Sequence, residues 1–447
     1  MDTSTSNATA AVNVDPVIDD AEATADTPFD WRNCWYPVTF LQDLPKDRPT
    51  GFAIYDEPMV LFVDGRGQVG CLPDRCPHRA ARLSDGQIMD GRLECRYHGW
   101  QFGADGQCLR VPQLWPEKDI PARACLPSHP VQIARGIVWV WTGEAGRADP
   151  ALIPGGAEGE GLFEVTFQMD LPYDQSYLIE NVIDVAHIHI AHDGVRGGGR
   201  REAALPLEFD IQESSRTAIR SRYRSVGLKR QSQSPSMKGA LVEFIAPNLI
   251  RYGSDYANPK LVAGLELYSL PIGKGRCRLL YRKYSNFTSW RERIKPRWRE
   301  HQIQCTILEQ DMAVVIGQHA EIETAGRPLR ELWLPLRSSD RLVVEYRKWL
   351  DRFGGDLPFY RGFATAKNSG LVPDLSHAPK DRHHLHTQVC ATCTKLNARV
   401  QMAIRGLWVV AAGCAALAPV TLPAVFAVAA LLALAAVAGL GRLQATL

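Results

Sequence analysis

The chain has 447 residues, which is long enough for two or three domains with full hydrophobic cores. Its 51 Lys and Arg nearly balance its 49 Asp and Glu, so the net charge of +2 gives no electrostatic reason to expect nucleic-acid binding. The 11 cysteines are scattered along the chain, which excludes the dense disulfide framework of a small secreted domain.

The first 28 residues are rich in Ala, Thr and Asp and contain no Lys or Arg. We expect residues 1–28 to form a disordered tail. A secretory signal needs a basic start and an apolar core, whereas an organellar transit peptide is rich in Arg and poor in acids, and this segment matches neither pattern. The sequence therefore predicts that the bulk of the chain is made and kept on the cytoplasmic side.

Three runs rich in β-branched and aromatic residues follow, each bounded by Gly, Asp or Pro. They predict strands at 34–41, 59–64 and 136–143. We assign residues 29–147 to one all-β domain. The segment 148–161 is rich in Gly and Pro, and we interpret it as the linker that follows this domain.

Two motifs in this domain place Cys close to His: C-P-H at Cys76 and His78, and C-R-Y-H at Cys95 and His98. A Rieske [2Fe–2S] cluster has this ligand set, because two thiolates hold one iron and two neutral imidazoles hold the other. The alternative is a structural zinc site, but its usual order is a Cys pair followed by a His pair. The alternating order predicts a Rieske cluster. Thiolate ligation also favours a reducing compartment.

The segments CPHRAARLSDG (76–86) and CRYHGWQFGADG (95–106) resemble the Rieske domain of ring-hydroxylating non-haem iron oxygenases. The Rieske proteins of respiratory and photosynthetic cytochrome complexes differ, since each of their loops carries an extra cysteine. Neither loop of this chain has one. The resemblance therefore implies the lower-potential cluster of an oxygenase.

Residues 162–365 form the second predicted domain, in which strands and helices are mixed. Strand-like runs occupy 162–171, 207–215, 278–286 and 341–350, and helical segments lie near 175–190 and 290–318. The resemblance implies a catalytic domain in which a sheet grips a long helix. The predicted fold class is α+β, an all-β Rieske domain followed by a helix-grip α/β catalytic domain.

Three histidines lie close together in the second domain: His187, His189 and His192. Non-haem Fe(II) oxygenases bind iron through two His and one carboxylate and leave positions open for O₂ and substrate. A five-residue gap turns by about 140° on a regular helix. The chain must therefore unwind after His187 if His187 and His192 are to face one iron. The alternative is a set of polar surface histidines.

This segment resembles the oxygenase pattern N-x-x-D-x-x-H-x-x-x-x-H. The resemblance implies that His187 and His192 bind iron and that His189 faces elsewhere. The matching aspartate, Asp184, bridges in this family between an iron-binding histidine and a Rieske histidine of the neighbouring subunit. A carboxylate suits this role because it accepts N–H bonds from both imidazoles. The alternative for Asp184 is an ordinary helix ion pair. Bridging implies a ring of subunits, most often a homotrimer.

The third iron ligand is implied by L-E-Q-D-M (308–312), which resembles the family's helix carrying the carboxylate. Asp311 stands in the matching position. The residues alone do not single it out, because Glu309 lies two positions away.

Residues 366–405 are polar and irregular in pattern, and we interpret them as a tether. They contain a C-x-x-C motif, Cys390 to Cys393, shortly after a His-rich run at 383–386. Such a motif can be redox-active, or it can bind zinc together with nearby histidines. No thioredoxin-like βαβ pattern surrounds it, and both interpretations stay open.

An uncharged stretch runs from Gly406 to Leu440. As one helix it would measure about 50 Å, against a hydrocarbon core of ~30 Å. Pro419 and Pro423 interrupt it, so residues 406–441 predict a transmembrane hairpin with passes at about 406–420 and 424–440. Basic residues flank both ends, which places both on the cytoplasmic side. The alternatives are one long tilted helix and a helical pair buried in a soluble fold.

The order of Rieske motif, mononuclear iron motif, C-x-x-C and membrane segment resembles the pheophorbide a oxygenase group over residues 31–442. This group includes the Rieske component of the plastid inner-envelope translocon and chlorophyllide a oxygenase. The resemblance implies an oxidoreductase, a mono- or dioxygenase of an inner or thylakoid-type membrane. Electrons would pass from a ferredoxin-like donor through the [2Fe–2S] cluster to a mononuclear non-haem Fe(II), which uses O₂.

The implied substrate is a hydrophobic small molecule, with a chlorophyll-type tetrapyrrole as first candidate and a sterol or another aromatic compound as the alternative. Two other functions compete with oxygenation. One is pure electron transfer by a Rieske membrane protein, and the other is redox sensing through the C-x-x-C motif.

Overall fold

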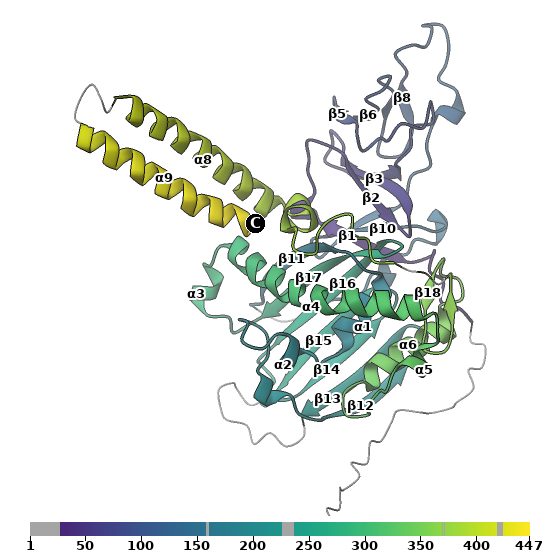
Figure 1. Ribbon diagram of the computed structural model, residues 1–447. Helices are drawn as coiled ribbons and strands as arrows, with labels where there is room; N and C mark the ends of the chain where they lie inside the picture. Colours follow the sequence, from purple (N-terminus) through teal and green to yellow (C-terminus); the bar gives the residue numbers. More distant parts are fainter. Residues whose placement is uncertain (1–26, 158–160, 226–236, 369, 371, 418–422) are drawn as a thin grey trace, which may run out of the picture.

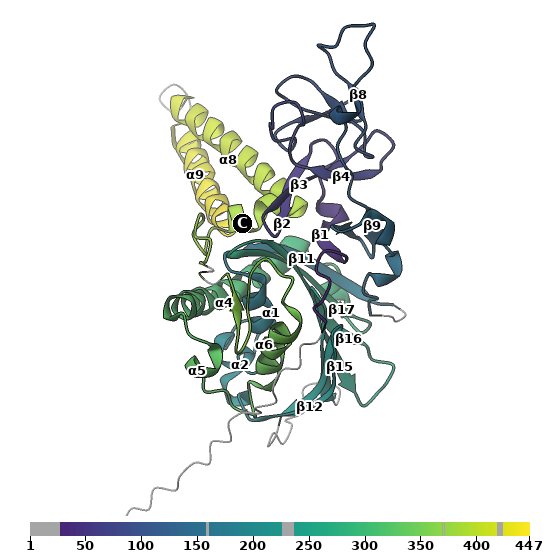
Figure 2. The ribbon, with the colours of Figure 1, turned by 90° about the vertical axis from the view of Figure 1, so that its right-hand side faces the viewer.

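The computed structural model describes residues 27–157, 161–225, 237–368, 370, 372–417 and 423–447. Residues 1–26 of the predicted tail, residues 158–160 of the predicted linker and Pro419 lie outside these ranges. The described chain has three parts: an N-terminal β domain, a large sheet covered by helices, and an arm of two helices (Figures 1 and 2).

The N-terminal domain contains three antiparallel sheets, and the predicted strands 34–41, 59–64 and 136–143 are confirmed as β1, β3 and β10. The first sheet joins β1 (Trp35–Phe40), β10 (Ile137–Trp141) and β9 (Val131–Ala134). The second joins β2 (Thr50–Ile54), β3 (Glu57–Val63) and β4 (Val69–Pro73). The third joins β5 (Gln87–Met89), β6 (Arg92–Glu94), β7 (Gln101–Phe102) and β8 (Cys108–Arg110), and it lies at the end of the domain remote from the large sheet (Figure 1).

The second domain is built on a seven-stranded antiparallel sheet of order β11-β17-β16-β15-β14-β13-β12. Its strands are β11 (Phe163–Leu171), β12 (Leu207–Ser214), β13 (Ala218–Ser225), β14 (Met237–Ile245), β15 (Leu249–Tyr256), β16 (Ala263–Gly273) and β17 (Arg276–Ser285). The predicted strands at 162–171, 207–215 and 278–286 are therefore confirmed. A small two-stranded sheet joins β18 (Tyr360–Arg361) to β19 (Ala366–Lys367).

Three helices fill the concave face of this curved sheet: α1 (Gln175–Ile183), α4 (Arg297–Ala325) and α6 (Arg341–Phe353) (Figure 2). This arrangement agrees with the expected sheet that grips a long helix. A buried ion pair between Glu180 of α1 and Arg347 of α6 joins two of these helices, and Gln318 of α4 donates to the same carboxylate at 3.0 Å. Short helices α2 (Ile188–Ala191), α3 (Trp290–Arg293) and α5 (Leu329–Leu332) lie between the main elements.

Short 3-10 turns occur at Leu41–Asp43, Ala122–Ala124, Ala145–Arg147, Pro150–Leu152, Arg201–Ala203 and Thr387–Val389.

The predicted strand at 341–350 is wrong, because these residues form α6. The β-branched pair 343–344 gives the segment a strand-like appearance. However, Leu342, Tyr346, Trp349 and Phe353 recur every three or four residues and are all buried against the sheet. This spacing places them on one face of a helix, and packing of that face outweighs local β propensity.

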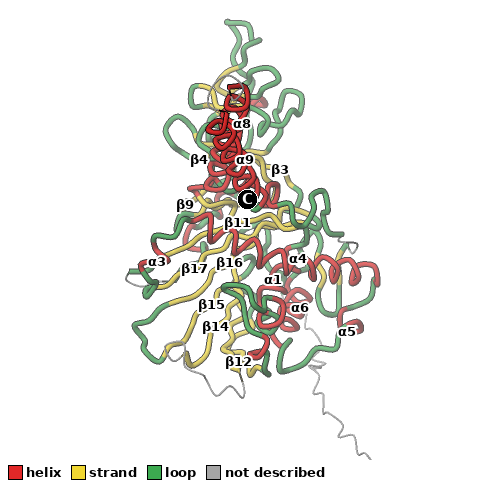
Figure 3. The backbone as a smooth tube through the Cα atoms, turned by 60° about the vertical axis from the view of Figure 1, so that its left-hand side comes forward, coloured by secondary structure: helices red, strands yellow, loops and turns green. Residues whose placement is uncertain are grey.

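The C-terminal part contains α7 (Arg382–Leu385), α8 (Ala391–Leu417) and α9 (Pro423–Ala445). The prediction of an irregular tether up to residue 405 is wrong beyond Ala391, where α8 begins. The segment 391–405 contains no Gly or Pro, so nothing in it interrupts a helix that starts earlier. Helices α8 and α9 lie side by side as a projecting arm, and the C-terminus returns to the base of α8 (Figures 1 and 3).

A helical hairpin is thus present where the sequence predicts one. Among the described residues, one helix is long and apolar enough to cross a membrane, Ala424–Ala445, with a mean hydropathy of 2.5. Only 6% of its apolar window is buried, and Val409 of α8 is 72% exposed. The arm is therefore not a helical pair buried in the core.

Candidate functional site

The four predicted Rieske ligands lie on two loops that share one backbone hydrogen-bond pattern. The amide of Ala80 donates to the Cys76 carbonyl and that of Gly99 to the Cys95 carbonyl, both at 2.9 Å. Each Cys amide in turn donates at 2.8 Å to the carbonyl five positions further on. Ala80 and Gly99 both have a positive φ, 59° and 73°, which glycine adopts freely and alanine rarely. The loops therefore close the same tight turn twice, facing each other.

These loops bury the sulfur atoms and expose the imidazoles. Cys76 and Cys95 are 2% and 1% exposed, whereas His78 is exposed and His98 is half-buried. The two imidazole centroids lie 4.4 Å apart, and the indole of Trp100 stacks on His78 at 4.7 Å. The donor set fits a [2Fe–2S] cluster whose histidine edge is accessible to another protein.

The structure brings together His187, His192 and Asp311, although they come from separate elements. Oδ1 of Asp311 lies 3.2 Å from Nε2 of His192 and 3.7 Å from Nε2 of His187. One potential donor atom from each residue falls within 4.8 Å of the other two. Burial lowers the pKa of His192, but the hydrogen bond and charge of Asp311 outweigh it, so the pKa is raised. Two imidazoles and one carboxylate in this arrangement fit a non-haem Fe(II) site with open positions.

The predicted unwinding of the chain occurs before His187 and not after it. Helix α1 ends at Ile183, and Asp184 has an extended backbone with φ −75° and ψ 106°. The Asp184 carboxylate accepts the amide of Ala186 at 2.8 Å, which stabilises the turn between α1 and α2. His187 and His192 then flank the single turn of α2 as its N-cap and C-cap residues. Both can therefore face Asp311.

Nearby polar residues that compete for these roles point elsewhere. Glu309 forms an ion pair with Arg382 and does not join the group. The Nδ1 atom of His189 accepts the amide of Arg200 at 3.4 Å, and His189 is also outside the group. The geometry thus favours Asp311 over Glu309.

Each of the two candidate iron ligands, His187 and His192, presents Nε2 to Asp311 and turns Nδ1 outward. Nδ1 of His192 pairs with the side-chain oxygen of Gln310 at 3.1 Å. Nδ1 of His187 lies 3.5 Å from Oδ2 of Asp184 and makes no hydrogen bond within the described chain. Such outer partners fix the tautomer and the ring orientation of a metal ligand.

A cavity of about 430 Å³ opens on His187 and Asp311 of this group. One wall is apolar and contains Val314, Val315, Val343 and the segment 332–335. The polar lining includes Asn181, Gln318 and the acidic residues Glu180, Asp184 and Asp340. Leu334 is 74% exposed, so the apolar wall continues to the surface. A larger cavity of about 1080 Å³, lined by parts of β11, β16 and β17 and by residues between 287 and 303, includes none of His187, His192 and Asp311.

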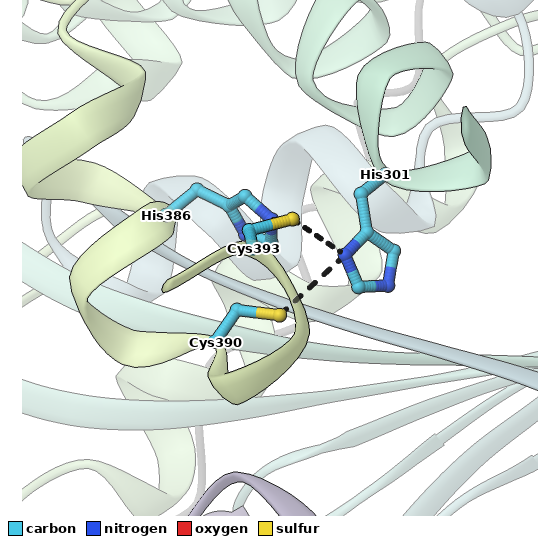
Figure 4. A group of neighbouring side chains, drawn as sticks. All are labelled: His301, His386, Cys390 and Cys393. Atoms are coloured by element: carbon cyan, nitrogen blue, oxygen red, sulfur yellow. Dashed lines mark hydrogen bonds between the residues drawn. The ribbon is translucent and has the colours of Figure 1, made fainter. Parts of the chain in front are cut away.

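A further buried group joins the C-x-x-C cysteines, Cys390 and Cys393, to His301 and His386 (Figure 4). The sequence points to His386 through the His-rich run at 383–386. It gives no signal for His301, which lies on α4, 89 residues before Cys390. His384 of the same run belongs instead to a more exposed group with His377 and Asp381.

Comparisons with known proteins identify the domains of this chain and its relatives. The family model of the Rieske [2Fe-2S] domain matches residues 34–130, and that of pheophorbide a oxygenase matches residues 244–328. The chain is 36% identical over 357 residues to protein TIC 55, chloroplastic, of Arabidopsis thaliana, covering 78% of this chain and 65% of that protein. It is 32% identical over 402 residues to pheophorbide a oxygenase, chloroplastic, of the same plant, covering 82% of this chain and 72% of that protein.

Among solved structures, dicamba monooxygenase bound to dicamba is similar in fold, with a TM-score of 0.58 and 23% sequence identity. The match covers 72% of this chain and 96% of that chain. The chain spans just under two thirds of the TIC 55 protein's own length.

Proposed function

This chain belongs to the family of Rieske-type oxygenases that includes pheophorbide a oxygenase, and from that premise we propose that it oxygenates a chlorophyll-type tetrapyrrole at a membrane surface. One observation carries the proposal. His187, His192 and Asp311 form one group, and His187 and Asp311 line a cavity with an apolar wall, in a chain that also has Rieske loops. A pure electron-transfer protein would need only the loops.

The residues divide between two cofactors. Cys76, His78, Cys95 and His98 would hold the [2Fe–2S] cluster, and His187, His192 and Asp311 would hold Fe(II). When bound, the cluster supplies single electrons and the iron supplies the activation of O₂. The protein around them orients the ligands: Gln310 holds the tautomer of His192, and Asn181 lies 3.5 Å from the Asp311 carboxylate.

The positions of the two centres support a homotrimer in which electrons cross between subunits. The β5–β8 sheet, next to the Rieske loops, and α2 lie at opposite ends of the folded molecule (Figure 1). Electron transfer through protein slows steeply with distance, so transfer within one chain is disfavoured. Asp184 would bridge from His187 to a Rieske histidine of the next subunit. Its side chain is 24% exposed, which leaves it accessible to a partner.

The cavity supports a hydrophobic substrate. Its wall from Leu332 to Pro335 is apolar and reaches the surface, so a flat apolar molecule can enter part-way while its polar edge stays in water. The names of the relatives make a tetrapyrrole the first candidate, and a sterol or another aromatic compound the alternative.

The arm supports attachment to a membrane. Gly406–Leu417 of α8 is uncharged and spans about 18 Å as 12 helical residues, which is less than a bilayer's hydrocarbon core. Helix α9 is uncharged from Pro423 to Gly441. We propose that the antiparallel pair enters the bilayer from one side, with Arg405 and Arg442 both at the cytoplasmic surface of an inner or thylakoid-type membrane.

The experiment uses the full-length protein in detergent with a reduced ferredoxin-type donor and ¹⁸O₂. Pheophorbide a, chlorophyllide a and a sterol are supplied in turn, and products are followed by mass spectrometry. Incorporation of ¹⁸O into a tetrapyrrole is the expected result, and Asp311→Asn should abolish it. Cluster oxidation without any labelled product, in protein free of mononuclear iron, would instead establish an electron-transfer protein.

A further inference from the structure

A second Cys/His set lies at the base of the arm, far along the chain from the Rieske loops. We propose that His301, His386, Cys390 and Cys393 form a closed tetrahedral zinc site that fastens the arm to the catalytic domain (Figure 4). This site is separate from both iron centres and does not depend on the proposed oxygenase activity.

The distances between the donor atoms match one four-coordinate ion. Sγ of Cys393 lies 3.3 Å from Nδ1 of His301 and 3.3 Å from Nε2 of His386. Sγ of Cys390 lies 3.5 Å from the same His301 nitrogen. Zinc bonds of about 2.3 Å to sulfur and about 2.0–2.1 Å to nitrogen, arranged tetrahedrally, separate the ligand atoms by about 3.5 Å. The side chains therefore need little movement to bind the ion.

Both imidazoles are held in the tautomer that a metal requires. The other nitrogen of His301, Nε2, lies 3.0 Å from the Thr166 carbonyl, and that of His386, Nδ1, lies 2.7 Å from the Gln168 carbonyl. A carbonyl only accepts, so each ring must place its N–H there. His301 Nδ1 and His386 Nε2 are consequently left with free lone pairs directed at the sulfurs. Carbonyls that orient metal-binding histidines in this way are typical of zinc sites.

Burial favours a structural ion over a thiol switch. His301 is fully buried, and His386, Cys390 and Cys393 are each 1% exposed. Phe167, which lies between the two carbonyl residues on β11, stacks on His386 at 4.6 Å. Thiol–disulfide exchange requires an attacking thiolate to reach a sulfur, and this shell blocks it. A closed shell of four protein ligands without an open position is the pattern of structural zinc.

The same contacts exclude a second two-iron cluster. In a Rieske cluster, the cysteines and the histidines bind different irons, which holds the two pairs apart. The Rieske loops show that separation, since their four residues are not among the described groups that fit a single ion. In the buried group, the sulfurs of both cysteines lie within 3.5 Å of imidazole nitrogens, so both kinds of ligand would face one ion.

The site joins three segments that sequence distance keeps apart. His301 belongs to α4, which also carries Asp311, while Cys393 lies in the first turn of α8. The C-terminal Leu447 packs against both cysteines, and Thr387 donates to its backbone carbonyl. Zinc would thus fix α4, the start of α8 and the end of α9 relative to one another. The ion would set the angle at which the arm leaves the domain.

The test is metal analysis of the full-length protein, purified without chelators from cells supplied with iron and zinc. We expect about one zinc per chain in addition to iron, with zinc K-edge absorption showing two sulfur and two nitrogen neighbours. Cys393→Ser should lose zinc and expose the arm's base to limited proteolysis, while the Rieske visible spectrum persists. Cys305→Ser is the matched control, because Cys305 is buried one turn after His301 on α4 but lies outside the group.

Iron-loaded wild-type protein with far less than one zinc per chain, or with Cys390 and Cys393 joined in a disulfide, would overturn the proposal. So would a zinc absorption edge without two sulfur neighbours, a measurement that needs no variant to fold. Retention of zinc by folded Cys393→Ser would do the same. None of these outcomes bears on oxygenation, which depends on His187, His192 and Asp311.

Discussion

Two sites in this chain use the same side chains, two Cys and two His, in opposite surroundings. In the Rieske loops, the cysteines are buried but His78 is exposed. At the base of the arm, all four side chains are buried, and the outer nitrogens of both imidazoles are bound to β11 carbonyls. An imidazole edge in solvent can pass electrons to a partner. A sealed imidazole can only hold an ion in place.

The comparison teaches that ligand type alone does not define a metal site. The Rieske set comes from two short loops with one repeated hydrogen-bond pattern, so it can form within a single small domain. The buried set forms only after α4, β11 and the segment 386–393 have come together. Loss of the first should therefore remove function and leave the fold, whereas loss of the second should loosen the fold.

The largest expected effect follows from His78→Ala. Removing this exposed ligand should eliminate the Rieske absorption and EPR signals and reduce turnover below detection, because no electron reaches the iron. Zinc content and proteolytic stability should stay at wild-type values. An unchanged Rieske spectrum in this variant would refute the assignment of His78 as a ligand.

The next test separates the arm from the site at its base. Replacing residues 409–438 by a flexible Gly-Ser linker should release the protein from membranes into the soluble fraction with all metals bound. The last residues are kept because Thr446 accepts a hydrogen bond from Gln302 at 2.6 Å and Leu447 packs on the cysteines. Loss of iron on this replacement would mean that the arm is part of the folded core.

Asp184→Asn should have a smaller effect. Both iron centres should load, but turnover should fall by about 10–100-fold, as for other residues that orient a metal ligand. The amide cannot accept N–H bonds on both of its ends, so it breaks the contact with His187 or with the partner. Metal content and product formation, measured on the same sample, show whether Asp184 acts in turnover without binding metal. Normal turnover would contradict the bridging role of Asp184.

The smallest effect is expected from Phe167→Leu, which removes the ring stacked on His386. The variant should lose about 1–2 kcal/mol of unfolding free energy, because aromatic stacking and some buried area are lost. Zinc should dissociate faster, while the Rieske spectrum is unchanged. Denaturant unfolding measures the loss of stability, and transfer of zinc to a chromogenic chelator measures its dissociation rate. Equal effects on the zinc site and on the Rieske cluster would contradict the proposed difference between the two sites.

The sequence predicts what is local and misses what depends on assembly. The sequence predicts Cys76, His78, Cys95 and His98 as Rieske ligands because their spacing is fixed within each loop. The β-branched residues of segment 341–350 predict a strand, whereas packing against the sheet makes this segment α6. The turn that positions His187 depends on an Asp184 side-chain bond, which displaces the break to the other side of the histidine.

His301 illustrates the limit most clearly. It lies mid-sequence in a polar helix, 89 residues before Cys390, and no spacing rule connects the two. His301 and Cys390 come together only in the folded protein, where the segment 386–393 lies against β11 and the start of α4. The ligands of the Rieske site lie close together in the sequence, so a motif predicts them. The ligands of the buried Cys/His site are far apart in the sequence, so only the three-dimensional structure identifies them.

The most direct test of the account mixes two inactive chains. His78→Ala lacks the cluster and His187→Ala lacks the mononuclear iron, so neither chain can carry electrons to O₂ by itself. Co-expressed in equal amounts, they would form mixed rings in which a junction works when its donor keeps the cluster and its acceptor keeps the iron. Each condition holds for half of the chains, so about one quarter of wild-type turnover should return if a cyclic assembly passes electrons between subunits. Complete absence of turnover in mixed assemblies that contain both metal centres would contradict transfer between subunits.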